Sequence, residues 1–165
     1  MIAVIGCGNP NRSDDGVGLE VIRILRQRAD IHARADVKLL DAGTDGMAVM
    51  FAARGCTTLL IIDSCKSQSA PGAIFEVPGS EAQSQHEASL NLHGFRWDHA
   101  LYAGRKIYRE AFPADVTAFL IEAKNLELGC ELSNEVRTAA IVVADKIAAR
   151  ISETPVQFES AGAVP

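Results

Sequence analysis

The sequence has no surplus of basic residues and no long apolar stretch. Its 165 residues include 16 Lys plus Arg against 21 Asp plus Glu, which gives a formal net charge of −5. Proteins that bind nucleic acids or anionic membranes usually carry a basic surplus, so both kinds of partner are disfavoured. Apolar runs such as residues 59–62 are much shorter than the roughly 20 residues of a transmembrane helix, so we expect no membrane insertion.

Signal-peptide features and paired cysteines are also lacking. Residues 1–6 have no basic region and no long apolar region, so we expect a cytoplasmic protein. No CxxC pair occurs, which disfavours a zinc knuckle or a thioredoxin-type site. In a reducing compartment the cysteines are expected to be free thiols. They are Cys7, Cys56, Cys65 and Cys130.

Length and composition indicate one ordinary globular domain. Two separate cores would each fall below the usual domain size. Hydrophobic residues make up 48% and charged residues 22%, values that exclude wholesale disorder and a fibrous protein. We expect a single domain over residues 1–152 and a mobile tail over 153–165, where no periodicity continues. No sustained heptad is present, and we expect a monomer.

Short apolar runs alternate with segments of helical periodicity. Strands are expected at residues 2–5, 37–40, 57–62, 73–77 and 116–121. Helices are expected at residues 14–25, 47–53, 94–111 and 134–151, with Ser133 as the N-cap of the last. Candidate buried positions in 94–111 are Phe95, Ala100, Leu101, Ala103 and Ile107.

This alternation predicts an α/β fold. We expect a three-layer sandwich with a mostly parallel, twisted five-stranded sheet and helices on both faces. The run at 57–62 is the most apolar and is expected to be central. The run at 73–77 is flanked by Pro-Gly pairs and is expected to form a short edge strand.

Several carboxylates fall where the predicted parallel strands end. Asp41 and Asp63 follow the second and third strands, and the pair Asp14-Asp15 follows the first. In such folds the carboxyl ends of the strands meet at one edge, where ligand sites lie. Asp63 is the hardest to explain structurally, because a carboxylate after a buried strand must be paired, hydrogen-bonded or bound to a cation.

Two common types of site are disfavoured by their missing residues. Gly6-Cys7-Gly8 follows a strand as in a dinucleotide-binding motif, but Asn11 stands where the third glycine belongs. The acids at the following helix start would also repel a pyrophosphate. Neither a P-loop nor a GxSxG motif occurs, whereas a Cys65–His93 nucleophile pair stays open.

A metal site suits the remaining residues better. Carboxylates with an imidazole favour a divalent cation such as nickel or zinc. Asp15 and Asp63 can supply the oxygen ligands, and His93 is the preferred histidine, with His86 as the fallback. Of the other two histidines, one follows the first helix and one lies within the 94–111 helix. The adjacent Arg96-Trp97 pair either offers a surface to a partner or has a packed Trp97 and a solvated Arg96.

Five segments in order resemble one family, the hydrogenase maturation endopeptidases, which process the large subunit of nickel–iron hydrogenases. The resemblance covers roughly residues 1–150. At the histidine, family members often have Ser-x-His. The segment Asn91-Leu92-His93 departs from this pattern, and Ser84-Gln85-His86 offers a competing match. The five segments are Gly6-x-Gly8-Asn9-Pro10-x-Arg12-x-Asp14-Asp15-Gly16-x-Gly18, Leu40-Asp41-Ala42-Gly43-Thr44-x-Gly46-Met47, Leu60-Ile61-Ile62-Asp63, Pro71-Gly72 and Leu132-Ser133-x-x-Val136.

The resemblance implies an endopeptidase that removes the C-terminal extension of a nickel-loaded large-subunit precursor. Asp15, Asp63 and His93 would recognise the metal and carry catalysis. The nickel would come with the substrate, and zinc or cadmium can take its place in a crystal. Two acids, Asp14 and Asp41, are candidate helpers that orient ligands or loops. A checkpoint or chaperone that binds metal without cleaving remains an alternative.

Four loop residues complete the predicted site. They are expected to shape the loops that receive the substrate peptide, and they belong to the first two motifs of the resemblance. They are Gly8, Asn9, Gly43 and Thr44.

Overall fold

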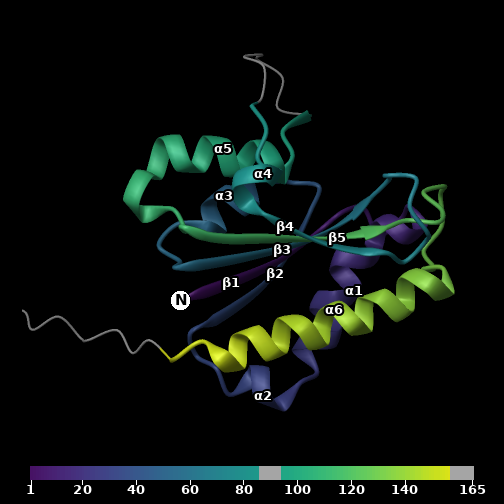
Figure 1. Cartoon of the computed structure of the whole chain (residues 1–165), viewed down its shortest axis with the longest axis horizontal. Coiled ribbons are helices and arrows are strands. Elements are labelled where there is room, and N and C mark those ends of the chain that lie inside the picture. The colour runs from purple at the N-terminus through teal and green to yellow at the C-terminus, as the bar shows by residue number, and fades with distance from the viewer. Residues whose placement is uncertain (86–93, 157–165) are drawn as a thin grey trace, which may run out of the picture.

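A five-stranded, mostly parallel sheet forms the centre of the protein, in a computed structural model that describes residues 1–85 and 94–156. The strand order is β2-β1-β3-β5-β4, and only β4 runs antiparallel to its neighbour. The α/β prediction is confirmed, with β3 central and β4 at an edge (Figure 1). The strands are β1 (Ile2–Cys7), β2 (Val37–Gly43), β3 (Thr58–Cys65), β4 (Ile74–Pro78) and β5 (Asp115–Glu122).

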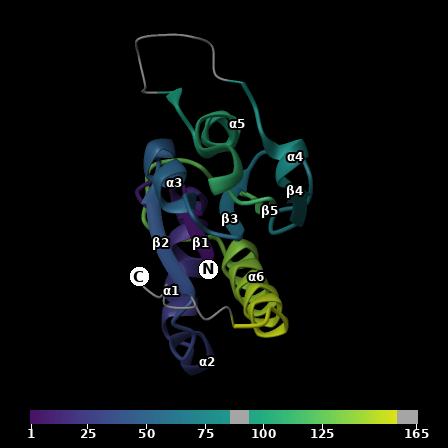
Figure 2. The same ribbon diagram turned by 90° about the vertical axis from the view of Figure 1, so that its left-hand side faces the viewer.

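Helices cover both faces of this sheet. Two long helices pack on one face, and a pair joined by close contacts packs on the other (Figures 1 and 2). The first face carries α1 (Val17–Arg26), α6 (Asn134–Glu153) and the short α2 (Ala29–His32). The second carries α3 (Gly46–Ala53), α5 (Trp97–Tyr108) and the short α4 (Gly79–Ala82). Of the predicted tail at 153–165, the structure describes residues 153–156.

Side-chain alternation along the central strands divides the core into two layers. In β3, Leu60 and Ile62 join the core beneath α1 and α6, whereas Leu59 and Ile61 join the core beneath α3 and α5. Successive side chains of a strand point to opposite faces. Asp63, two residues after Ile61, therefore points toward the α3 and α5 side.

Several predicted boundaries were wrong. We expected Asp41 and Asp63 to follow their strands, but β2 continues to Gly43 through its pairing with β1, and β3 continues to Cys65 because it pairs with β5 as far as Glu122. The helix expected at 94–111 is shorter, since Arg109 has a φ of 47° and leaves the right-handed helical region after Tyr108. Near this end Ile107 is 62% exposed, so its predicted burial was wrong.

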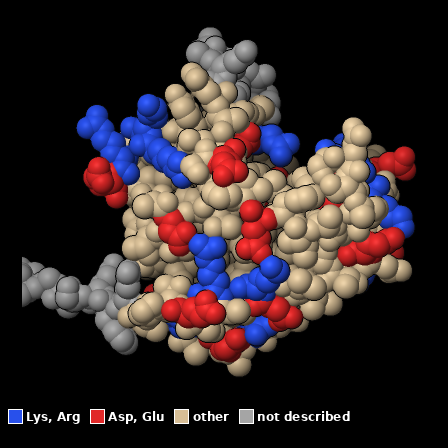
Figure 3. All heavy atoms as spheres, viewed as in Figure 1, with Lys and Arg blue, Asp and Glu red and all other residues tan. Residues whose placement is uncertain are grey.

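Charged residues of both signs are interspersed over α6 and the neighbouring strands (Figure 3). Lys146 forms an ion pair with Glu76 of β4, and Arg150 forms one with Asp115 of β5. These exposed pairs join α6 to the strands beside it, although each contributes little to stability. Among the described residues, no helix is both long enough and apolar enough to cross a membrane.

Asp14 is fully buried and ties together two loops at the carboxyl edge of the sheet. It lies in η1, a 3₁₀ turn at Ser13–Gly16. Its carboxylate accepts hydrogen bonds from the backbone N–H groups of Lys124, Asn125 and Ser133. The Ser133 hydroxyl also donates to Asp14 at 3.0 Å, so it makes no side-chain cap on α6. Asp14 therefore stabilises the loop between β5 and α6.

Replacing Asp14 with Ala should destabilise the fold by about 2–4 kcal/mol, because three backbone N–H groups and one hydroxyl lose the buried carboxylate that accepts from them. Urea unfolding followed by circular dichroism measures the change. Asp145→Ala is the matched control, since Asp145 is an exposed carboxylate on α6 paired with Arg28. An Asp14→Ala unfolding midpoint equal to that of the control would contradict the structural role of Asp14.

Candidate active site

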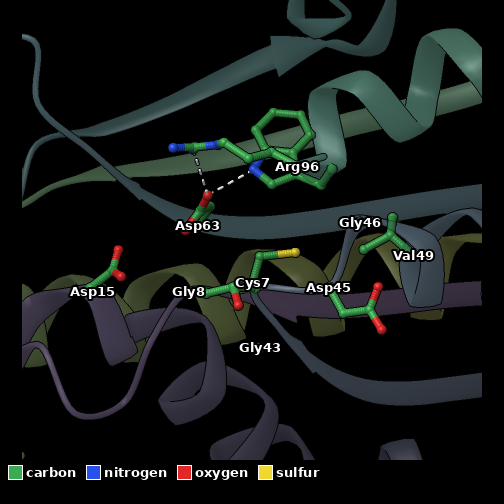
Figure 4. Close-up of a pocket in the computed structure, with 11 residues that line it drawn as sticks. Cys7, Gly8, Asp15, Gly43, Asp45, Gly46, Val49, Asp63 and Arg96 are labelled. Carbon is green, nitrogen blue, oxygen red and sulfur yellow. Dashed lines mark hydrogen bonds and ion pairs between the residues drawn. The ribbon is translucent and has the colours of Figure 1, made fainter. Parts of the chain in front are cut away.

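A pocket of about 160 Å³ opens at the carboxyl ends of the parallel strands (Figure 4). It lies between the loop after β1, the loop after β2, the end of β3 and the start of α5. The pocket brings the carboxylates of Asp15 and Asp63 to one place. Its lining consists of Cys7, Gly8, Asp15, Gly43, Thr44, Asp45, Gly46, Val49, Asp63, Arg96 and Trp97.

Asp63 is the buried acid of the pocket, with 5% of its surface exposed. Its Oδ1 accepts a hydrogen bond from the backbone N–H of Ser64 at 2.8 Å. Its Oδ2 accepts one from the indole Nε1 of Trp97 at 2.7 Å and a longer one from Arg96 at 3.4 Å. Burial raises the pKa of Asp63 to about 6, and the hydrogen bond from Trp97 opposes this rise.

Asp15 is the second acid, held at the mouth of the pocket by short polar contacts. Its Oδ1 accepts a hydrogen bond from the Ser64 hydroxyl at 2.6 Å, and its Oδ2 accepts one from the backbone N–H of Asn9 at 2.9 Å. Ser64 thus contacts both acids, one through its hydroxyl and the other through its N–H. Figure 4 shows the Asp15 carboxylate extending toward the side where Asp63 and Arg96 lie.

Gly8 permits the close approach of these segments. Its φ is +111°, and a Cβ at this position would lie 1.9 Å from the main-chain oxygen of Asp15. The same Cβ would lie 3.3 Å from Oδ1 of Asp63. A side chain at residue 8 would therefore collide with the Asp15 backbone beside the Asp63 carboxylate, which explains the need for glycine here.

The loop after β2 forms another wall of the pocket. The carbonyl of Gly43 accepts a hydrogen bond from the N–H of Gly8 at 2.8 Å, which joins the two loops. The exposed Asp41 stabilises this turn by accepting from the N–H of Gly43. Thr44 is exposed on the rim, and Asp45 caps the N-terminus of α3. Neither Asp41 nor Asp14 lines the pocket.

The donor set of the pocket fits a divalent cation. Each oxygen of Asp15 accepts one hydrogen bond, and so does Oδ1 of Asp63. A carboxylate oxygen has two lone pairs, so these oxygens retain capacity for a ligand. Within residues 1–85 and 94–156, no group of three His, Cys, Asp or Glu side chains is placed to hold a metal. The predicted third ligand, His93, and its fallback His86 lie outside the described residues.

Cys7 and Cys65, the two cysteines near the pocket, have raised pKa values that disfavour a role as nucleophile. Burial, with the negative charge of Asp63 as a smaller cause, raises the pKa of Cys7 well above its usual value. Burial and then the hydrogen bond to Glu122 raise the pKa of Cys65 to about 12. Because the thiolate is the reactive form, the Cys65–His93 alternative is disfavoured.

Sequence reasoning missed two partners of the acids, Trp97 and Ser64. Of the two alternatives for Trp97, the packed one is confirmed, because the side chain is buried, but its hydrogen bond to Asp63 was not predicted. Arg96 is exposed, yet it reaches the same carboxylate. A buried Asp63 requires a hydrogen-bond donor or a cation. No local sequence pattern identifies Trp97 as that donor, because it lies 34 residues away along the chain.

Known proteins resemble this chain along most of its length. A family model described as "Hydrogenase maturation protease" matches residues 19–150, a range that contains Asp63 and begins after Asp15. The hydrogenase maturating endopeptidase HybD from E. coli superposes with a TM-score of 0.74 at 24% identity, covering 92% of each chain. The [NiFe] hydrogenase maturation protease HybD from Thermococcus kodakarensis gives a TM-score of 0.65 at 27% identity, covering 92% of this chain and 99% of that one.

One curated sequence is also similar. The delta subunit of coenzyme F420 hydrogenase from Methanothermobacter thermautotrophicus is 30% identical over an alignment of 93 residues that covers 52% of this chain. The chain spans 59% of that relative's length.

The raised pKa of Asp63 makes stability depend on pH. Above about pH 6 the folded protein must carry a buried charge, whereas in the unfolded chain the carboxyl group ionises near the ordinary aspartate pKa of 3.8. Stability from this group is therefore greatest below pH 3.8 and is lost as pH rises through 6. Asp63→Asn replaces the acid with a neutral isostere. The free energy of unfolding of this variant, relative to that of wild type, should rise by about 2–3 kcal/mol between pH 4 and pH 7.5.

Urea unfolding in a chelator at the two pH values tests this expectation. Asp145→Asn, in which the replaced acid is exposed, controls for the loss of net charge. A difference between Asp63→Asn and wild type that stays the same at both pH values would contradict a raised pKa for Asp63.

Proposed function

Because the chain belongs to the hydrogenase maturation protease family, we propose that it removes the C-terminal extension of a nickel–iron hydrogenase large-subunit precursor whose nickel is already in place. The observation that supports this most directly is the meeting of Asp15 and Asp63 in one pocket at the carboxyl edge of the sheet. The family consists of proteases. Recognition of nickel and removal of a C-terminal segment are what we propose beyond membership of the family.

In this proposal Asp15 and Asp63 recognise the nickel that the precursor carries. His93 supplies the imidazole, with His86 as the fallback. Two carboxylates and one imidazole leave coordination positions open for groups of the substrate. A bound divalent cation supplies Lewis-acid chemistry, polarising a carbonyl or lowering the pKa of a water. The chain's own part is to hold the two carboxylates and to exclude most solvent from Asp63.

The substrate peptide enters along the exposed rim of the pocket. Thr44 and Asp45 are exposed there, and Gly43 adds no side chain to obstruct a peptide backbone. Arg96 is also exposed, and its positive charge partly offsets the two acids. The described cysteines are free thiols, which suits the reducing cytoplasm where we place the reaction.

The hydrogenase substrate has support from the comparisons, at the level of the family. The curated relative is named as a hydrogenase subunit, and the structural relatives are named as hydrogenase maturation enzymes. A phosphate-bearing ligand is disfavoured, because the loop after β1 presents the Asp15 carboxylate where a dinucleotide site needs free N–H groups.

Incubation with nickel-loaded and nickel-free precursor, followed by mass spectrometry, tests the activity. The loaded precursor should lose its C-terminal segment and the nickel-free form should remain intact. Asp15→Asn and Asp63→Asn should each lower the cleavage rate at least about 100-fold, because each removes a charged ligand of the cation. Asp145→Asn should cleave at the wild-type rate.

A loaded precursor whose mass does not change would contradict the protease assignment. If that precursor instead formed a complex requiring Asp15 and Asp63, the protein would act as a checkpoint that binds metal without cleaving. Cleavage of the nickel-free form at an equal rate would contradict nickel recognition alone.

The third ligand has its own test. His93→Ala should lose cleavage, and His86→Ala should retain it, because the resemblance places the ligand shortly before α5. Cleavage by both variants is measured on the same loaded precursor. The reverse pattern would reassign the ligand to His86.

A further inference from the structure

The indole of Trp97 holds the Asp63 carboxylate at a fixed point. Trp97 is the first residue of α5, with 7% of its surface exposed, and its Nε1 lies 2.7 Å from Oδ2 of Asp63. An indole N–H can only donate a hydrogen bond. Oδ2 therefore has a short hydrogen bond from a buried donor of the protein.

The other oxygen of Asp63 faces the second acid. Oδ1 accepts the Ser64 N–H at 2.8 Å and lies where a Cβ on Gly8 would come within 3.3 Å of it. The same Cβ would contact the main chain of Asp15, so Oδ1 lies on the Asp15 side of the pocket. Since Oδ1 has a second lone pair, it is the oxygen of Asp63 that a cation shared with Asp15 would meet.

The position of Trp97 is set by packing, independently of Asp63. Gly46 at the start of α3 brings that helix against the segment before Trp97, because a Cβ there would lie 2.4 Å from the Phe95 carbonyl oxygen. The indole also belongs to the apolar layer between the sheet and α3 and α5, together with Val49 and Leu101. A ring fixed in this way can orient the carboxylate rather than follow it.

Arg96 is a weaker partner of the same oxygen. Its side chain is 65% exposed and its contact with Oδ2 is 3.4 Å long. Water competes with such a contact, and a long exposed side chain keeps much of its freedom. The short, buried indole contact therefore determines the orientation of Asp63.

We propose that Trp97 is a positioning residue, whose indole N–H orients Asp63 so that Oδ1 is presented beside Asp15 to a divalent cation. The proposal rests on the proposed function in one respect, namely that these two acids bind the cation. Partners that orient metal ligands typically change metal affinity about 10–100-fold when they are removed. Trp97→Phe keeps an aromatic ring and removes only the N–H and part of the indole.

Calorimetric titration with Ni²⁺ tests the role. Trp97→Phe should bind Ni²⁺ about 10–100-fold more weakly than wild type. Ile147→Val is the matched control, because it also trims a buried side chain but lies in the core beneath α1 and α6, on the other face of the sheet from Trp97 and Asp63. This control should lower the melting temperature and keep the wild-type Ni²⁺ affinity. Equal affinities of Trp97→Phe and wild type would overturn the positioning role and leave the proposed function intact.

A second measurement needs no substitution at Trp97. The sequence contains a single tryptophan, so intrinsic tryptophan fluorescence reports on this residue alone. Titration with Cd²⁺, which is not paramagnetic, should change the emission in a saturable way. Asp63→Asn should abolish the response and Asp145→Asn should keep it. Emission unchanged by Cd²⁺, while calorimetry shows that Cd²⁺ binds, would overturn the proposal even if Trp97→Phe failed to fold.

Failure of the proposed function has a different signature. Wild-type protein would then bind neither Ni²⁺ nor Cd²⁺ and would leave the loaded precursor uncut. That result would overturn the positioning role together with the cation site.

Discussion

The hydrogen-bonded, buried carboxylate of Asp63 is the constraint on which the carboxyl edge of the sheet depends. It lies in the central strand with almost no exposure, and its oxygens are held by β3 and by the start of α5. Burial raises its pKa to about 6, so its charged form is costly to the folded protein. Buried carboxylates with a raised pKa in a pocket are typical of functional sites.

The second acid reaches this place through backbone geometry. Parallel pairing of β1 with β3 brings the end of one strand beside the end of the other. The backbone at Asp15 then passes so close to Gly8 that residue 8 has no room for a side chain. Ser64 completes the arrangement by contacting Asp15 through its hydroxyl. Two acids separated by 48 positions in the sequence thus share one pocket, which suits recognition of a cation.

Much of the fold could be predicted because its signals are local. The most apolar run is the central strand, and the run between Pro-Gly pairs is the edge strand. The helical periodicity at 134–151 predicted α6, whose buried face runs from Val136 to Ile151. The end of α5 at Tyr108 was not predicted, because the positive φ at Arg109 carries no clear sequence signal, and Ile107 in its last turn is exposed.

The site was less predictable, because its contacts join residues far apart in the sequence. Asp63 could be singled out from the buried strand alone, but its donor Trp97 depends on how α5 packs against α3. Asp14 was expected to orient ligands or a loop. The structure shows contacts for the loop alternative, because Asp14 lies outside the pocket and accepts hydrogen bonds from the loop between β5 and α6. Which histidine completes the ligands is a question for residues 86–93, beyond the described part of the chain.

The central claim is that Asp15 and Asp63 share one cation. Anomalous diffraction from a crystal grown with Cd²⁺ tests it most directly, since the peak gives the ion's position without an assay. We predict a single strong peak in the pocket, within bonding distance of a carboxylate oxygen of Asp15 and of Oδ1 of Asp63. A peak bound to other residues, with both of these carboxylates unbound, would contradict the account.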